Sequence, residues 1–145
     1  MQLKKYTDYA LRVLIFTGLK KDGELASIKE ISDVFHISSH HLGKVVHQLT
    51  KLELLESVRG RNGGIRLAKP AEEINLGKLV RILENDFDLL ECFNKDVNQC
   101  VITPACTLKH ALNKALHAFF QVLDEYTIQD LIDNELELRE LMGIS

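Results

Sequence analysis

The chain has 145 residues, 46% of them hydrophobic and 27% charged, which is the composition of one globular domain or of a compact domain with a dimerisation arm. No run of about 18 apolar residues is present, so a membrane-spanning helix is excluded. No small-residue cleavage site follows the apolar stretch 13–16, so we expect no signal peptide but a cytoplasmic protein. In such a protein an odd number of cysteines, here three, argues against a disulfide framework and for metal or redox use.

The net charge of −3 hides an asymmetry between the two halves of the chain. Residues 1–67 carry 11 basic and 7 acidic side chains, a balance of +4, whereas residues 68–145 carry 7 and 14, a balance of −7. A basic half joined to an acidic half suggests that only the first half meets a polyanion. Uneven surface charge without any partner is the alternative that the charges alone leave open.

The chain begins with two predicted helices. Thr7 can cap a first helix over about residues 8–20, in which apolar residues recur on one stripe. Ser27, followed three residues later by Glu30, forms the capping-box pattern that predicts the start of a second, short helix. A tight turn at residues 36–38 ends this second helix.

A third helix is predicted from Ser38 or Ser39, either of which can cap it, to about residue 52. Two helices joined by so brief a turn are typical of a helix-turn-helix. The residues that the third helix leaves outside its apolar stripe include no carboxylate, whereas an ordinary solvated face mixes acids with bases. A helix bound for the DNA major groove needs donors and cations, because phosphates and many base edges are acceptors. The candidate residues are Ser38, Ser39, His40, His41, Lys44, His47, Gln48 and Lys51.

Residues 55–67 form two short alternating runs around a glycine-rich turn, which predicts a β-hairpin. Arg59, Arg61 and Asn62 fall at its tip, and after a helix-turn-helix such a hairpin is the wing of a winged helix, suited to phosphate or minor-groove contact. The glycines remove side chains where the hairpin approaches another backbone. A plain surface hairpin with two arginines is the alternative.

The rest of the chain is predicted to be helical around one irregular loop. Pro70 marks a boundary, and helices are expected over about 76–84, over some 20 residues from Thr107, and over 128–142 at the periphery. The long apolar stripe of the helix from Thr107 favours an oligomer interface, or packing against the first helix. We therefore expect a mainly α fold with a small β-hairpin wing, in which residues 1–70 bind DNA and residues 71–145 hold the cysteines and the dimerisation helices.

All three cysteines lie in one segment, residues 91–106, which we call the cysteine loop. Cys92, Cys100 and Cys106 have the spacing C-x7-C-x5-C. Thiolates select zinc, cuprous copper or iron–sulfur clusters, and three of them leave the last coordination position to another ligand. His110, one helical turn after Cys106, would complete a structural zinc set, although the cysteine spacing lacks the knuckle that zinc modules favour. Three unrelated thiols remain a further alternative.

An enzyme is not expected. A cysteine beside His110 could form a dyad, but the chain shows no oxyanion-hole motif, no glycine-rich phosphate loop and no carboxylate pair within a cleft signature.

Four features together resemble the Rrf family of bacterial winged-helix regulators, and within it the nitric-oxide-sensing iron–sulfur repressors. They are Tyr6-Thr-Asp8-Tyr-Ala-Leu-Arg12, the helix-turn-helix, Gly60-x-x-Gly63-Gly64-x-x-Leu67, and Glu91-Cys92…Cys100…Pro104-x-Cys106-x-Leu108-Lys109. The resemblance covers nearly the whole chain. It implies a transcriptional repressor that binds a palindromic operator as a homodimer, paired through the long C-terminal helix.

The resemblance also implies a cofactor. The three cysteines would hold an iron–sulfur cluster, 4Fe–4S in preference to 2Fe–2S, that reacts with nitric oxide. Asp8, by its position, would be the fourth ligand, given by the same or the partner subunit. Asp8 and Arg12 are four residues apart on a helix, so a surface ion pair is the other interpretation. Cysteine-bearing relatives sense cluster supply or another redox input, which keeps a second signal open.

Overall fold

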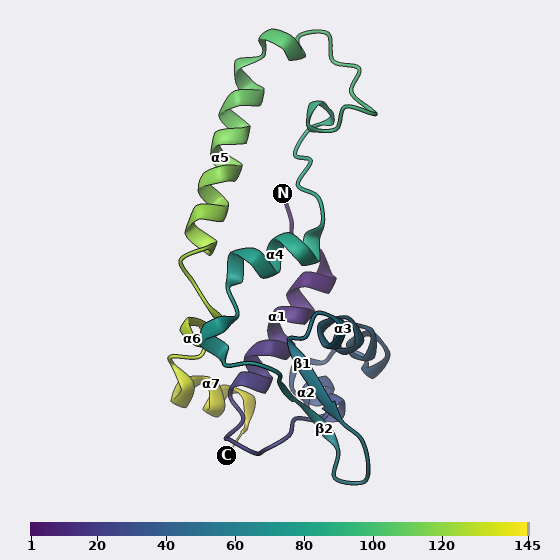
Figure 1. Ribbon diagram of the computed structural model, residues 1–145, viewed down its shortest axis with the longest axis vertical. Helices are drawn as coiled ribbons and strands as arrows, with labels where there is room; N and C mark the ends of the chain where they lie inside the picture. Colours follow the sequence, from purple (N-terminus) through teal and green to yellow (C-terminus); the bar gives the residue numbers. More distant parts are fainter. Residues whose placement is uncertain (145) are drawn as a thin grey trace.

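The computed structural model describes residues 1–144, which form helices and one small hairpin (Figure 1). In chain order the elements are α1 (Lys5–Gly18), α2 (Ile28–Phe35), α3 (Ser39–Lys51), β1 (Leu55–Val58), β2 (Gly64–Leu67), α4 (Leu76–Glu84), α5 (Thr107–Leu123), α6 (Ile128–Leu131) and α7 (Glu135–Met142). This mainly helical fold with a two-stranded wing confirms the predicted fold class. Of the helices in these residues, none is long and apolar enough to cross a membrane.

Local capping interactions define the helix-turn-helix. At the start of α2 the Glu30 N–H donates to Ser27 Oγ (3.0 Å) and the Ser27 N–H donates to the Glu30 carboxylate (2.8 Å), which confirms the predicted capping box. The helix ends at His36, whose left-handed φ of 55° turns the chain sharply. Ser38 then caps α3 by accepting a hydrogen bond from the His41 N–H (3.2 Å).

The first helix begins earlier than predicted. It starts at Lys5, and Thr7, the predicted cap, lies inside its first turns with the side chain wholly buried. Within residues 1–144 the Thr7 hydroxyl is a buried side-chain oxygen without a hydrogen-bond partner. A distant residue fixes the start of α1 instead. The Lys4 N–H donates to Glu84 Oε1 (2.7 Å), and Lys4 Nζ donates to the Glu84 carbonyl oxygen (2.6 Å).

The hydrophobic core lies where α1 packs against α3 and the hairpin. The buried hydrophobic side chains of α1 and α3 are Ala10, Val13, Leu14, Phe16, Leu42, Val45, Val46 and Leu49. Two isoleucines near the C-terminal end, Ile128 and Ile132, join the same cluster. Residues 128–142 were expected at the periphery, and that expectation is wrong for this part, because α6 supplies apolar side chains to the core.

The hairpin is attached to the segment that precedes α2 by a pair of backbone hydrogen bonds. Val58 of β1 lies opposite Gly64 of β2 in an antiparallel pair. On the other side of β2, the Ala26 N–H donates to the Ile65 carbonyl (2.9 Å), and the Ile65 N–H donates to the Ala26 carbonyl (2.7 Å). A side chain at Gly64 would place its Cβ 2.5 Å from the Ala26 carbonyl oxygen. Glycine is therefore required at this position by a close backbone approach, as predicted.

Beyond α4 the chain forms an arm. Residues 85–106 run away from the helix-turn-helix and α5 returns beside them, so the cysteine loop lies at the end of the molecule opposite the wing (Figure 1). At the base of the arm, Phe120 of α5 packs with Leu76 and Val80 of α4. The Arg81 guanidinium also donates two hydrogen bonds to the Asp124 carboxylate, at 2.5 and 3.0 Å.

Candidate nucleic-acid interface and cysteine loop

The outward face of α3 carries hydrogen-bond donors and cations and no carboxylate. Four exposed residues recur along it at helical spacing: His40, Lys44, His47 and Lys51. Of the other residues predicted on this surface, Ser38, Ser39 and His41 are exposed and Gln48 is half-buried. Such donors and cations suit phosphates and the acceptor edges of bases. The predicted recognition surface is therefore open to a nucleic acid.

The tip of the wing is also open and basic. Arg59, Arg61 and Asn62 are exposed, in a turn closed by a hydrogen bond from the Gly63 N–H to the Gly60 carbonyl (3.0 Å). Neither tip arginine forms an ion pair within residues 1–144. Their positive charge is available to an anion.

In the strands of the hairpin, by contrast, the arginine is not available to an anion. Arg66 of β2 is neutralised by Glu56 of β1 across the hairpin (2.9 Å). The hydrogen bond from Arg66 lowers the pKa of the Glu56 carboxyl, which keeps the pair ionised. The free positive charge of the hairpin is thereby concentrated at its tip.

The first turns of α1 lie against the flank of α3, a contact that the sequence analysis missed. The Tyr9 and His41 rings stack with centroids 6.5 Å apart, and the Tyr6 hydroxyl donates a long hydrogen bond (3.5 Å) to the Lys44 carbonyl. Burial raises the pKa of the Tyr6 hydroxyl. No local motif marks this contact, because it joins residues of two helices that only the tertiary fold brings together.

The cysteine loop is held by short-range hydrogen bonds. The Thr103 hydroxyl donates to the Cys100 carbonyl (2.8 Å), and the Cys100 N–H donates to Asn98 Oδ1 (3.1 Å). All three cysteines are free thiols; Cys92 is buried, while Cys100 and Cys106 are half-buried. Cys106 also occupies the N-cap position of α5, so the loop leads directly into the long helix.

The thiols do not form a preassembled metal site. Among residues 1–144, no three His, Cys, Asp or Glu side chains converge closely enough to hold a metal ion. Asp8 and His110 are therefore not grouped with the cysteines of their own chain. The donor types fit a thiolate-bound centre, since three free thiols on one loop are the ligands that such centres take. Cys92, Cys100 and Cys106 would have to come together around it.

Asp8 is paired with Arg12 in this structure. The Arg12 guanidinium donates hydrogen bonds of 2.9 and 2.8 Å to the two Asp8 carboxylate oxygens, the geometry of the alternative interpretation. The guanidinium carbon also lies 5.6 Å from the centre of the Phe35 ring at the end of α2. Arg12 thus connects the Asp8 carboxylate to the helix-turn-helix.

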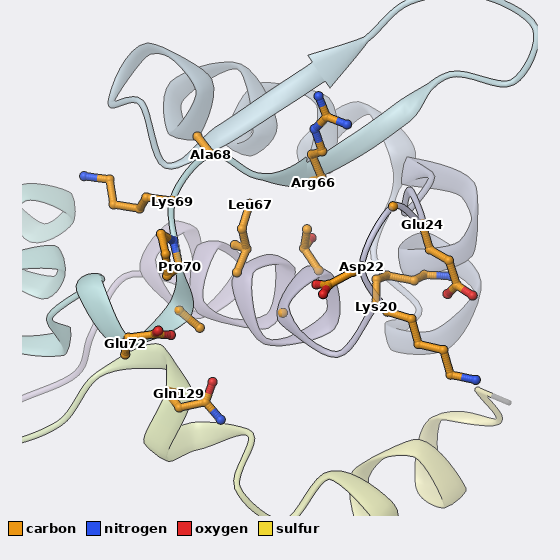
Figure 2. A pocket seen from close by; sticks show the side chains of 15 residues that line it. Lys20, Asp22, Glu24, Arg66, Leu67, Ala68, Lys69, Pro70, Glu72 and Gln129 are labelled. Atoms are coloured by element: carbon orange, nitrogen blue, oxygen red, sulfur yellow. The ribbon is translucent and has the colours of Figure 1, made fainter.

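A cavity among the described residues lies away from both of these surfaces. It has a volume of 540 Å³ between the end of α1, β2 and the start of α6. Figure 2 shows that its lining mixes the acidic Asp22, Glu24 and Glu72 with the basic Lys20, Arg66 and Lys69. Lys20 and Arg66 are already paired with carboxylates. The mixed charges give this cavity no preference for a polyanion.

Comparison with known protein families gives a match over most of the chain. The model of the Rrf2 family, described as "Iron-dependent Transcriptional regulator", matches residues 3–134. The chain is 72% identical to the HTH-type transcriptional regulator NsrR of Oceanobacillus iheyensis over 144 residues, which are 99% of this chain and 98% of that protein. It is 49% identical to NsrR of Bacillus subtilis, over 98% of this chain and 97% of that protein. These relatives are named as transcriptional regulators, a non-enzymatic role, as predicted.

Solved structures agree on the fold. The oxidized form of Staphylococcus aureus CymR superposes with a TM-score of 0.75 at 27% identity, over 92% of this chain and 97% of that one. The structure of T. potens IscR gives a TM-score of 0.71 at 22% identity, over 92% and 88% of the two chains, which shows a shared fold.

Proposed function

This chain belongs to the Rrf2 family of transcriptional regulators, and from that membership we propose that it is a homodimeric repressor whose affinity for operator DNA is switched by an iron–sulfur cluster that reacts with nitric oxide. The DNA-binding role follows from the family. The single observation that carries it in this structure is the combination of a carboxylate-free, exposed face on α3 and an exposed wing tip with two unpaired arginines. The cluster and its signal are the finer part of the proposal.

On DNA, α3 would enter the major groove and the wing would lie along the backbone. The exposed histidines and lysines of α3 supply donors to base edges and phosphates, while Arg59 and Arg61 neutralise phosphates. Two copies related by a two-fold axis would read the two halves of a palindrome about one helical turn apart.

The wing is tested by replacing both tip arginines with glutamine. Each phosphate contact contributes close to one unit to the slope of log affinity against log salt concentration. In the homodimer this double variant removes four arginines, two from each wing, so it should bind all duplexes more weakly and show a slope shallower by about 4. Arg66→Gln, which removes a neutralised arginine from the same hairpin, is the matched control. An unchanged slope in the double variant would remove the wing from the DNA interface.

Cys92, Cys100 and Cys106 would hold the cluster as thiolates, and Asp8 would be its fourth ligand. When bound, the cluster supplies iron that nitric oxide can attack. Asp8 is not grouped with the cysteines of its own chain, and those cysteines are not grouped with one another, so both the same subunit and the partner subunit remain sources of Asp8 under this proposal. To serve as a ligand, the Asp8 carboxylate must give up its two hydrogen bonds from Arg12.

Two contacts support a connection between the cysteine loop and the DNA-binding surface. Glu84, at the end of α4 where the chain leaves for the loop, holds the backbone of Lys4 at the start of α1. Arg12, released from Asp8, would keep only its contact with Phe35 on α2. Through these two contacts, a change in the cysteine loop would alter the distance between the two α3 helices of the dimer. The dimer would then shift from a population with one spacing to a population with another.

The decisive experiment for the cofactor is the colour of anaerobically purified protein. We expect the broad visible absorption of an iron–sulfur chromophore, its bleaching by nitric oxide and a parallel loss of operator binding. Cys92→Ala should be colourless and bind the operator weakly. Colourless wild-type protein that contains zinc would instead support the Cys106–His110 set. A cluster that nitric oxide leaves intact would point to a supply or redox signal, and full repression by Cys92→Ala would contradict the coupling.

A further inference from the structure

A small pocket lies on the flank of α3 that faces α1. It has a volume of 270 Å³ and is lined by Lys5, Tyr6, Tyr9, His41, Lys44 and Val45. Three of these residues come from the first turns of α1 and three from α3, so the pocket exists only because the two helices pack together. None of its lining residues is acidic.

The walls of the pocket are aromatic and its rim is positive. The Tyr9 and His41 rings stack at 6.5 Å between centroids with an interplanar angle of 29°, and both line the pocket. Lys5 and Lys44 are exposed, and neither forms an ion pair within residues 1–144. A ligand for this pocket therefore needs a compact apolar part to cover the rings and an anionic part to meet the two ammonium groups.

The position of the pocket relates it to the proposed DNA interface. Lys44 belongs both to the rim of the pocket and to the outward line of α3. The major groove is about 12 Å wide and an α-helix with its side chains about 10 Å across, so the two sugar–phosphate strands must run along the flanks of a helix that fills the groove. His41 and Val45 are on the flank of α3 that α1 covers. A DNA strand on that side would pass over the pocket.

We propose that this pocket seats one sugar–phosphate unit of the operator backbone, so that α1 contributes to the DNA interface. The inference rests on the proposed function and adds residues to its DNA-binding surface. Lys5 and Lys44 bind the phosphate, and the Tyr9 and His41 rings cover the deoxyribose. Tyr6 is a positioning residue, because its hydroxyl holds the Lys44 backbone against α1.

This contact also lies beside the attachment of the cysteine loop. Lys5 directly follows Lys4, whose N–H is held by Glu84 at the end of α4. A movement of α4 would therefore displace one wall of the pocket relative to α3. A backbone contact at this point makes DNA affinity sensitive to the position of the loop without any change in α3 itself.

The test compares Lys5→Gln with Lys21→Gln in the full-length protein. The control lysine is exposed beyond the other end of α1, a helix about 20 Å long from Lys5 to Gly18. The probe is a duplex that the wild-type protein selects from a random-sequence library, and binding is measured by fluorescence anisotropy over a range of salt concentrations. Lys5→Gln removes one phosphate contact in each half-site, so it should lower the slope of log affinity against log salt for the dimer by about 2. Lys21→Gln should keep the wild-type slope.

Ethylation interference locates the contact. One backbone phosphate in each half-site should interfere with the wild-type protein and cease to interfere with Lys5→Gln. If the two lysine variants give the same slope and the same interference pattern, α1 does not contact DNA and the inference is overturned. The proposed function would survive that result as long as the Arg59 and Arg61 variant still weakens binding. Failure of the wild-type protein to select any duplex would instead contradict the proposed function.

Discussion

Gly77 of α4 lies so close to the end of α5 that one added methyl group would disturb the packing of these two helices. A Cβ at this position would overlap the Asp124 carboxylate and lie 2.9 Å from the Asp124 backbone nitrogen. Because Asp124 is also fixed by Arg81, it cannot move aside without breaking that ion pair. We expect Gly77→Ala to lower the free energy of unfolding by about 1–3 kcal/mol, the usual effect of overpacking, when measured by urea denaturation.

Gly43 in α3 is the matched control. A Cβ there would meet no atom of the described residues within 4 Å, outside the backbone of its own helix. Gly43→Ala should raise the free energy of unfolding by about 0.5–1 kcal/mol, because alanine loses less backbone entropy in a helix. Equal stability of the two variants would mean that the end of α5 does not pack closely on α4.

The Arg81–Asp124 pair predicts a dependence of stability on pH. The hydrogen bond from Arg81 lowers the pKa of the Asp124 carboxyl in the folded protein. A lowered carboxyl pKa contributes stability that is present above the unfolded-state pKa, about 3.9, and is lost as the pH falls through the folded-state pKa. Wild type should therefore exceed Asp124→Asn in stability at pH 7, and the difference should shrink below about pH 4. A difference that is the same across this range would contradict the ion pair.

At the level of helices and strands, the sequence correctly predicted the helix ends whose position is determined by residues close to them in the chain. The capping box of Ser27 and Glu30 and the cap at Ser38 act over three residues, and both helices start where predicted. The start of α1 was predicted about three residues late, because it depends on Glu84, which is 80 residues from Lys4 in sequence. The residues around Thr7 carry no sign of that contact, so the local sequence pattern could not predict it.

For the candidate sites, too, features set by nearby residues could be predicted, whereas contacts between distant residues could not. The residue types on α3, at the wing tip and in the cysteine loop could be predicted, since helical spacing and ligand chemistry are local properties. The pocket between Tyr9 and His41 could not, because it depends on how α1 packs on α3. The arrangement of the thiols stays a prediction as well. In residues 1–144 of a single chain they do not form a group that could hold a metal ion, and their spacing in the sequence does not determine which other side chain would complete the set.

The hydrogen bond from the Lys4 N–H to Glu84, which fixes the start of α1, can be tested directly. Glu84→Ala leaves the Lys4 N–H without its acceptor and should speed amide hydrogen exchange over residues 4–8, with a cost of about 1 kcal/mol in stability. Glu84→Gln keeps an oxygen that can accept the bond and should leave the exchange close to that of wild type. Hydrogen exchange followed by mass spectrometry distinguishes the two. Equal protection in both variants would show that Glu84 does not anchor α1.

At the scale of the whole molecule, the arm leaves apolar surface uncovered by its own chain. Leu108 and Val122 of α5 are 59% and 55% exposed, and Tyr126 just beyond it is 44% exposed. These residues belong to the stripe that predicted an oligomer interface, whereas Phe120 on another side of α5 packs against α4. Contiguous exposed apolar surface of this kind marks an interaction site. A second copy of the chain is the occupant that the proposed palindromic operator would require.

A charge placed in this stripe should separate the subunits. Val122→Asp puts a carboxylate at the proposed interface, whereas Gln121→Asp adds the same charge to the neighbouring residue, about 100° around the helix. In sedimentation equilibrium we expect Val122→Asp to be monomeric and Gln121→Asp to remain dimeric, with equal helical content by circular dichroism. Operator affinity should fall roughly 100-fold or more in the monomer, because the second half-site no longer binds as part of one molecule. A dimeric Val122→Asp protein with wild-type affinity would show that the subunits pair through another surface.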